Sequence, residues 1–209
     1  MRADHDHRTS RSTVFPAGTE AALRECARRL DGAGVLVVSG FPASGKTTAA
    51  RFAAAVAGAT VLDKDSYAPG LEDAVMAALT GDRFDRDSDV YHSVVAPHLY
   101  AGLVRVGVTV GARHPVVLDA PFLALIRQAA DAGISLREQL LTVAEVTEPV
   151  PVTTVWLDAP TEEIRARMTA RGAERDTGKL ADWDTYQAAV LDSGLRDLAH
   201  SVVDHVIPN

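Results

Sequence analysis

The sequence predicts an α/β fold in which a mostly parallel sheet of five strands is covered by helices on both faces. Short apolar runs rich in β-branched residues alternate along the chain with longer segments of helical periodicity. These runs are apolar throughout rather than alternately polar, which is typical of parallel strands buried on both faces. We therefore expect three layers, with ligands bound at the carboxyl ends of the strands.

The expected elements follow one another at regular intervals. The predicted strands are residues 35–39, 60–63, 115–119, 152–157 and 202–207. The predicted helices are residues 19–30, 48–55, 71–79, 90–110, 122–146, 161–171 and 184–198. Pro97 should bend one helix, Gly133 should divide another, and Thr161 should cap a third.

The length of 209 residues and the hydrophobic content of 47% suit one domain with a buried core. Residues 1–13 are expected to form a disordered tail, residues 14–209 the domain, and the polar segment 172–182 a lid. No apolar run approaches ~18 residues, which predicts no membrane span. The N-terminus has no apolar segment behind its charges, so a secretory signal is not expected.

Charge and cysteine content limit the partners. The formal net charge is −7 and no basic cluster stands out, which argues against a nucleic-acid partner. The single cysteine, Cys26, excludes an internal disulfide, and we expect a cytoplasmic protein. The sequence leaves open whether it is a monomer or a homodimer.

One contiguous motif predicts the ligand class. Residues 40–47 read Gly-Phe-Pro-Ala-Ser-Gly-Lys-Thr, the G-x-x-x-x-G-K-T pattern of a phosphate-binding P-loop, between a predicted strand and a predicted helix. Glycine lets successive backbone N–H groups face a phosphate, and the helix N-terminus adds partial positive charge. We expect a nucleoside triphosphate to be bound by Gly40, Ala43, Ser44, Gly45, Lys46, Thr47 and Thr48.

Three side chains should complete a magnesium–nucleotide site. Lys46 can bridge the β- and γ-phosphates, and Thr47 can offer its hydroxyl to Mg²⁺. Asp119 ends an apolar strand, as a Walker B aspartate that holds Mg²⁺ does, although a turn residue is the alternative. The next residue is Ala120 rather than the glutamate that activates water in many ATP-hydrolysing motors, which favours an acceptor other than water.

Two more carboxylates follow the second predicted strand. Asp63 and Asp65 are spaced i, i+2, so in extended backbone both point to the same side. One could orient an acceptor hydroxyl and take its proton, and the other could assist Mg²⁺. We assign the base to Asp65, which lies further toward the ligand edge, and a metal role to Asp63. A solvated acidic turn is the alternative.

Arginines near the predicted lid are candidates for binding the phosphates. Arg167 and Arg171 share a helix face, and Arg175 follows in the polar segment. Arginines on a lid can close on a triphosphate, stabilise charge on the transferring group and exclude water. The alternative is a solvated helix face paired with neighbouring glutamates.

The aspartates at the strand ends, including Asp158, should converge with the P-loop on one crevice. An acceptor pocket would then form from the segment between the second and third strands. Its candidate residues are Tyr67, Arg83, Arg86, Tyr91, His92 and His98.

With these motifs placed, residues 33–207 resemble the P-loop small-molecule kinases, which have an AAA-type ATP-binding domain. The group includes chloramphenicol phosphotransferase, zeta-toxin-type kinases, and gluconate and shikimate kinases. The resemblance rests on the P-loop, on Val117-Leu118-Asp119, and on residues 155–160 followed by two arginines. It implies a P-loop NTPase fold with ATP and Mg²⁺, Asp65 as acceptor base, and Arg167 and Arg171 on the ATP.

Three functions remain open from the sequence. The favoured one is ATP-dependent transfer of the γ-phosphate to a hydroxyl of a small molecule such as an antibiotic, nucleoside or other metabolite, with Lys46, Asp65 and Arg171 as catalytic residues. The second is a nucleotide or polynucleotide kinase, and the acidic charge argues against a polynucleotide acceptor. The third is a regulatory P-loop ATPase that acts through protein partners. The choice between ATP and GTP is also open.

Overall fold

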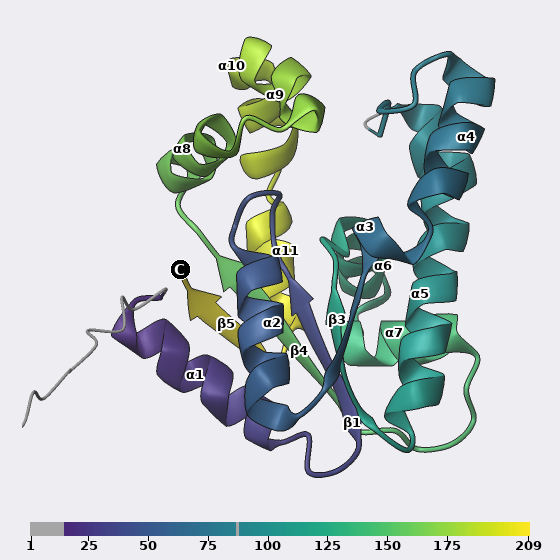
Figure 1. The fold of residues 1–209 in the computed structure, drawn as a ribbon, viewed down its shortest axis with the longest axis vertical. Helices are drawn as coiled ribbons and strands as arrows, with labels where there is room; N and C mark the ends of the chain where they lie inside the picture. The colour runs from purple at the N-terminus through teal and green to yellow at the C-terminus, as the bar shows by residue number, and fades with distance from the viewer. Residues whose placement is uncertain (1–14, 87) are drawn as a thin grey trace, which may run out of the picture.

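The computed structural model describes residues 15–86 and 88–209, so the tail predicted over residues 1–13 lies outside the described residues. At its centre is a five-stranded sheet in the order β2-β3-β1-β4-β5 (Figure 1). All of its neighbouring strands pair in parallel, which confirms the predicted sheet. The strands are β1 (Gly34–Ser39), β2 (Thr60–Asp63), β3 (Pro115–Asp119), β4 (Val152–Asp158) and β5 (His205–Pro208).

The sheet separates two hydrophobic cores, because alternate residues of a strand point to opposite faces. Val35 and Val37 of β1 contribute to the larger core, whereas Leu36 and Val38 contribute to the smaller one. Helices α1 (Ala17–Arg28) and α2 (Lys46–Ala57) cover the smaller core. The larger core is covered by α5 (Ala96–Gly111), α6 (Leu123–Ala132), α7 (Leu136–Ala144) and α11 (Leu195–Val202).

The remaining helices rise beyond the carboxyl ends of the strands (Figure 1). On one side lie α3 (Lys64–Tyr67) and α4 (Pro69–Thr80), which continue from β2. On the other side, α8 (Thr161–Arg171) continues from β4. It is followed by the short helices η2 (Glu174–Asp176), α9 (Thr177–Ala181), α10 (Trp183–Tyr186) and η3 (Gln187–Leu191). The two groups flank the edge where ligands are expected.

The segment after α8 differs from the predicted polar loop at 172–182 and helix at 184–198. Short helices fill the predicted loop because Asp176 is buried and accepts hydrogen bonds from Arg171. The next short helix is held by Trp183 and Tyr186, which are buried in the larger core. The predicted helix is broken before α11 at Gly194, which has φ 78°. Thr161 does not cap α8, since Pro160 occupies the N-cap position.

The helix predicted over residues 90–110 is a π-helical turn, η1 (Tyr91–Val95), continued by α5, with Pro97 in the first turn of α5 rather than at a bend. Within the described residues, one helix, Tyr91–Gly111, is long and apolar enough to cross a membrane by length and composition. Helices in the core of proteins that do not enter a membrane can meet the same criteria of length and composition. This helix packs on the sheet, where a Cβ at Gly107 would lie 2.5 Å from Leu118.

Candidate active site

The P-loop connects β1 to α2 and curves at glycines that no other residue could replace easily. Gly45, at the N-cap of α2, has φ 98°, and a Cβ there would lie 2.5 Å from Asn209 Nδ2. A Cβ at Gly40 would lie 2.7 Å from the carbonyl oxygen of Leu157. Ser44 Oγ is buried and without a hydrogen-bond partner, so the loop contains an unsatisfied polar atom that a ligand oxygen or water could satisfy.

Lys46 begins α2 and is buried, with 8% of its surface exposed. Its Nζ donates to the carbonyl oxygen of Phe41 at 2.7 Å, which leaves two N–H donors for a ligand. Burial lowers the pKa of Lys46 to about 8, partly opposed by the charge of Asp119. A phosphate group bound at the loop would place a negative charge beside the Lys46 ammonium and stabilise its protonated form.

Asp119 lies at the end of β3, next to the P-loop. In the sheet register it pairs with Val38 of β1 on one side and with Asp63 of β2 on the other. Burial raises the pKa of Asp119, a hydrogen bond from Thr47 and the charge of Lys46 oppose the shift, and Asp63 and Asp65 add to it. The sheet therefore brings together the residues predicted to hold the metal.

These residues fit a magnesium ion that is shared with a nucleotide. Mg²⁺ in such sites takes one or two carboxylates together with phosphate oxygens and water, rather than a cage made by protein alone. The hydrogen-bonded pair of Asp119 and Thr47 matches this donor set. Among the described residues, no group of three or more His, Cys, Asp or Glu side chains could hold a metal, so the phosphates would have to complete the coordination.

Asp63 and Asp65 do not share extended backbone, so the same-side placement expected for that case does not arise. The strand ends at Asp63, which caps α3 by accepting a hydrogen bond from the Ser66 backbone at 2.8 Å. Asp65 lies in the first turn of α3, half exposed, and forms ion pairs with Arg175 and, at 3.8 Å, with Lys64. The metal role of Asp63 and the base role of Asp65 stay predictions.

Burial alone would raise the pKa of Asp65. The hydrogen bond and charge of Arg175, together with the charges of Lys64 and Arg86, outweigh this effect and hold the pKa below its usual value. Asp65 is therefore held as a carboxylate at the ligand edge, and its pair with Arg175 has to open before it can accept a hydrogen bond or a proton from a ligand.

The three predicted phosphate-binding arginines are all engaged with protein groups. Arg167 Nη1 donates to the carbonyl oxygen of Ser44 at 3.0 Å, so this arginine lies directly on the P-loop. Arg171 is held in a bidentate pair by buried Asp176, at 2.5 and 2.7 Å. Arg175 bonds Asp65 instead of facing a phosphate. Contact with a nucleotide would require Arg171 and Arg175 to exchange these partners.

Asp158 also lies at the ligand edge, but its contacts are with α11. It pairs with Arg196 at 3.0 Å and with His200 Nε2 at 3.5 Å, and Trp156 Nε1 donates to it at 3.3 Å. The prediction that it would converge with the other aspartates receives no support from these contacts.

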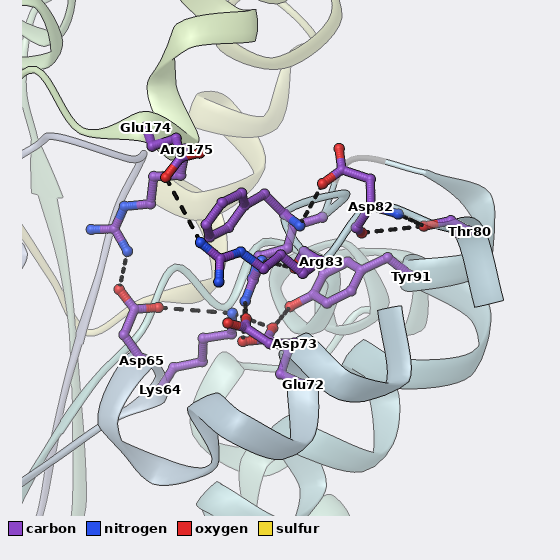
Figure 2. Close-up of polar contacts among 12 residues, drawn as sticks. Lys64, Asp65, Glu72, Asp73, Thr80, Asp82, Arg83, Tyr91, Glu174 and Arg175 are labelled. Carbon is purple, nitrogen blue, oxygen red and sulfur yellow. Dashed lines mark hydrogen bonds and ion pairs between the residues drawn. The ribbon is translucent and has the colours of Figure 1, made fainter. Parts of the chain in front are cut away.

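A charged network lies beside Asp65, and its central residue was not among the predicted site residues (Figure 2). Glu72 of α4 has a side chain only 2% exposed, and it accepts hydrogen bonds from Lys64 at 2.5 Å, Tyr91 at 2.7 Å and Arg86 at 3.1 Å. Arg86 also donates to Asp73 at 2.6 Å. We call Lys64, Glu72, Asp73, Arg86 and Tyr91 the Glu72 network.

Of the candidates for an acceptor pocket, Arg86 and Tyr91 belong to the Glu72 network, and Arg83 lies 4.0 Å from Glu174. His92 and His98 are exposed. A cleft of about 300 Å³ is bordered by Asp65, Glu72, Phe84, Arg86, Glu174 and Arg175, together with Pro69 and Ala173. One available signal was that Lys64 is among only three lysines; nothing marked Glu72.

Asn209 is a second residue that the sequence analysis missed. Its side-chain amide donates to the carbonyl oxygen of Ser44 at 2.7 Å. Its backbone N–H donates to the backbone carbonyl oxygen of Asp158, also at 2.7 Å. The residue that follows β5 thereby holds the P-loop next to the N-terminus of α2. No motif in the sequence indicates this contact.

The fold, the P-loop and the buried aspartate beside it define a P-loop nucleotide-binding protein. A family model described as an AAA domain matches residues 35–191, and the chain belongs to the AAA domain family. This result agrees with the AAA-type ATP-binding domain that the sequence resemblance implied. No curated protein matches the chain.

Solved structures with a similar fold include two kinases. A gluconokinase from Sinorhizobium meliloti 1021 has 19% identity and a TM-score of 0.46, over 85% of this chain and 82% of its own. A shikimate kinase from Acinetobacter baumannii in complex with shikimate has 18% identity and a TM-score of 0.47, over 88% of this chain and 87% of its own. At these values we take neither an activity nor a site from the likeness.

Proposed function

We propose that this protein is an ATP-dependent phosphotransferase that moves the γ-phosphate of ATP to a hydroxyl group of a small molecule. The observation that carries the proposal is the placement of an ionised carboxylate, Asp65, beside a cleft at the same sheet edge as the P-loop. A nucleotide site alone would serve many functions. Phosphate transfer to a hydroxyl requires a nucleotide site and, next to it, a base that borders a cleft for the acceptor.

On the nucleotide side, the P-loop N–H groups and Lys46 bind the phosphates, and Lys46 stabilises the charge that develops on the transferring group. Thr47 and Asp119 would hold Mg²⁺, which would neutralise phosphate charge during transfer. Arg167 lies against Ser44 and closes the site from α8. Arg171 joins it once it leaves Asp176.

On the acceptor side, Asp65 accepts a hydrogen bond from the acceptor hydroxyl and orients its oxygen toward the γ-phosphorus. A bond forms between that oxygen and the γ-phosphorus while the bond from phosphorus to the β,γ-bridging oxygen breaks. ADP leaves with the bonding electrons, and the hydroxyl proton passes to Asp65. Arg175 must release Asp65 first, which frees its guanidinium to face the phosphates.

Two features favour transfer to a hydroxyl over hydrolysis. Ala120 follows Asp119 and is buried, so no carboxylate stands there to activate water. The segment at residues 173–175 borders the cleft, and as a lid it would exclude water from the γ-phosphate. The proposal includes a single domain over residues 14–209 with its lid at about 172–182, in a cytoplasmic protein that is a monomer or homodimer.

The test is ADP release from Mg-ATP in the presence of hydroxylated metabolites, nucleosides, antibiotics and a 5′-hydroxyl oligonucleotide, with Lys46→Ala as the blank. Stimulation by one class of compound, with a phosphate mass shift on that compound, is the expected result. Steady hydrolysis that no compound stimulates, and that Lys46→Ala abolishes, would instead favour a regulatory ATPase.

A further inference from the structure

The cleft beside Asp65 contains charged groups of both signs, and its cations are already neutralised by protein carboxylates. Two cations, Arg175 and Arg86, border the cleft. Arg86 is held by groups of the protein. Its Nη2 donates to both Glu72 and Asp73, and its Nη1 donates to the Arg83 carbonyl oxygen at 2.8 Å. An arginine held between two carboxylates has little net charge to offer an anionic ligand.

Lys64 is equally committed. Its Nζ is buried and lies 2.5 Å from Glu72, with Asp65 at 3.8 Å. The burial of Glu72 matters here, because a carboxylate removed from water and surrounded by three donors keeps its partners in place. Lys64 cannot leave Glu72 for a ligand without separating a buried ion pair, and Arg86 would have to give up its bonds to both Glu72 and Asp73.

Two ion pairs of opposite polarity join the lid to the residues around the cleft (Figure 2). Adjacent lid residues Glu174 and Arg175 face Arg83 and Asp65 respectively. Arg175 is the cation that the proposed reaction draws away toward the phosphates. Once it leaves, the charged residues that border the cleft are the acids Asp65, Glu72 and Glu174 and the base Arg86. Their partners Lys64, Asp73 and Arg83 lie outside the lining, and with these included the acids still outnumber the bases by one.

We infer that the acceptor site selects hydroxyl compounds that carry no anionic group, and that Glu72 and Asp73 determine this specificity by neutralising Lys64 and Arg86. The inference rests on the proposed phosphotransferase function and adds the class of its acceptor. A carboxylate or phosphate placed in this cleft would meet an excess of negative charge without a free cation to pair with. A neutral polyol or an amine-bearing alcohol meets no such penalty.

The test compares hydroxyl compounds in pairs that differ by one anionic group: glucose with gluconate, methyl shikimate with shikimate, and a nucleoside with its monophosphate. The full chain with Mg-ATP is assayed for phosphate transfer to each compound. We expect kcat/KM for the neutral member of an active pair to exceed that of its anionic partner by about tenfold or more.

Equal or faster transfer to the anionic member overturns the inference and leaves the proposed function standing. Absence of transfer to every compound, with ATP hydrolysis that Lys46→Ala abolishes, contradicts the proposed function itself, and the inference fails with it. The two failures are therefore distinguishable in one assay.

A variant tests the role of the carboxylates. Asp73 is partly exposed, and Asp73→Asn removes one of the two carboxylates that neutralise Arg86. We expect the ratio of neutral to anionic kcat/KM to fall by about threefold or more. The matched control is Asp131→Asn, which removes the same charge from an exposed position on α6. A ratio that is the same in both variants would show that Arg86 neutralisation does not set specificity.

Discussion

The proposed nucleotide side and the proposed acceptor side of this site are built in different ways. The nucleotide side is a contiguous loop, residues 40–47, whose ligand groups are backbone N–H donors and one buried lysine. The acceptor side is assembled from side chains of α3, α4, the loop at residues 81–86 and η1, joined by buried Glu72. A backbone site recognises a group common to all nucleoside triphosphates, whereas a side-chain network can differ from one acceptor to another.

The largest expected effect is on the nucleotide side. Lys46→Ala removes the only charged side chain within the P-loop, so we expect phosphate transfer to fall by about a thousandfold and Mg-ATP affinity to fall with it. Transfer kinetics and calorimetric titration with Mg-ATP measure the two effects. Arg51→Ala, an exposed cation on the same helix, is the control and should behave as wild type. Normal turnover in Lys46→Ala would contradict the assignment of the site.

The next effect falls on the stability of the acceptor side. Glu72→Gln leaves Lys64 and Arg86 without their shared carboxylate, and we expect the free energy of unfolding to decrease by about 3 kcal/mol. Tyr91→Phe removes one donor and no charge, so its loss should be about 1 kcal/mol. Urea unfolding followed by circular dichroism measures both. Equal losses in the two variants would show that the charges of the network are not what stabilises it.

The Glu72 effect should depend on pH. Burial alone would raise the pKa of Glu72, but the hydrogen bonds from Lys64, Tyr91 and Arg86 outweigh it, and the pKa lies below the ordinary value of 4.5. A carboxylate with a depressed folded-state pKa stabilises the fold above its unfolded pKa and loses that contribution as the pH falls through the folded pKa. The difference in stability between wild type and Glu72→Gln should therefore shrink below about pH 4.5. A difference that is constant from pH 7 to pH 3 would contradict this account.

A smaller effect is expected where β5 meets the P-loop. Asn209→Ala removes the amide that donates to the Ser44 carbonyl oxygen, while Arg167 keeps its own bond to the same oxygen. The loss of one hydrogen bond should weaken Mg-ATP affinity by about fivefold and leave acceptor preference unchanged. Gln128→Ala, which removes a surface amide from α6, is the control for calorimetric titration. Unchanged affinity would limit Asn209 to a structural contact.

The sequence predicted what depends on local pattern. The three central strands were predicted from apolar runs because β1, β3 and β4 are buried along most of their length. The edge strands β2 and β5 are more exposed, and β5 begins at His205 rather than at residue 202. The P-loop was recognised because its residues are contiguous and its flanking strand and helix have clear signals. Asp119 was placed correctly at the end of its strand because parallel strands bring their carboxyl ends to one edge.

What the sequence did not reveal depends on distant contacts. Glu72 is buried only when α4 packs near α3 and η1. The side chains that donate hydrogen bonds to its carboxylate come from residues between 64 and 91. The contact of Asn209 with Ser44 requires the strand order that sets β5 beside β4. The polar composition of residues 172–182 gave no sign of the short helices there. These helices are held in place by the ion pair between Arg171 and buried Asp176. Polarity indicated exposure there, whereas a bidentate ion pair permits burial.

The most direct test of the account is to measure Mg-ATP affinity and phosphate transfer on the same preparation of Asp65→Asn. If the two sides are separate and Asp65 is the acceptor base, Mg-ATP affinity should match wild type while transfer to the acceptor falls by about a hundredfold or more. Full transfer by Asp65→Asn, or a loss of transfer accounted for entirely by weaker nucleotide binding, would contradict the account.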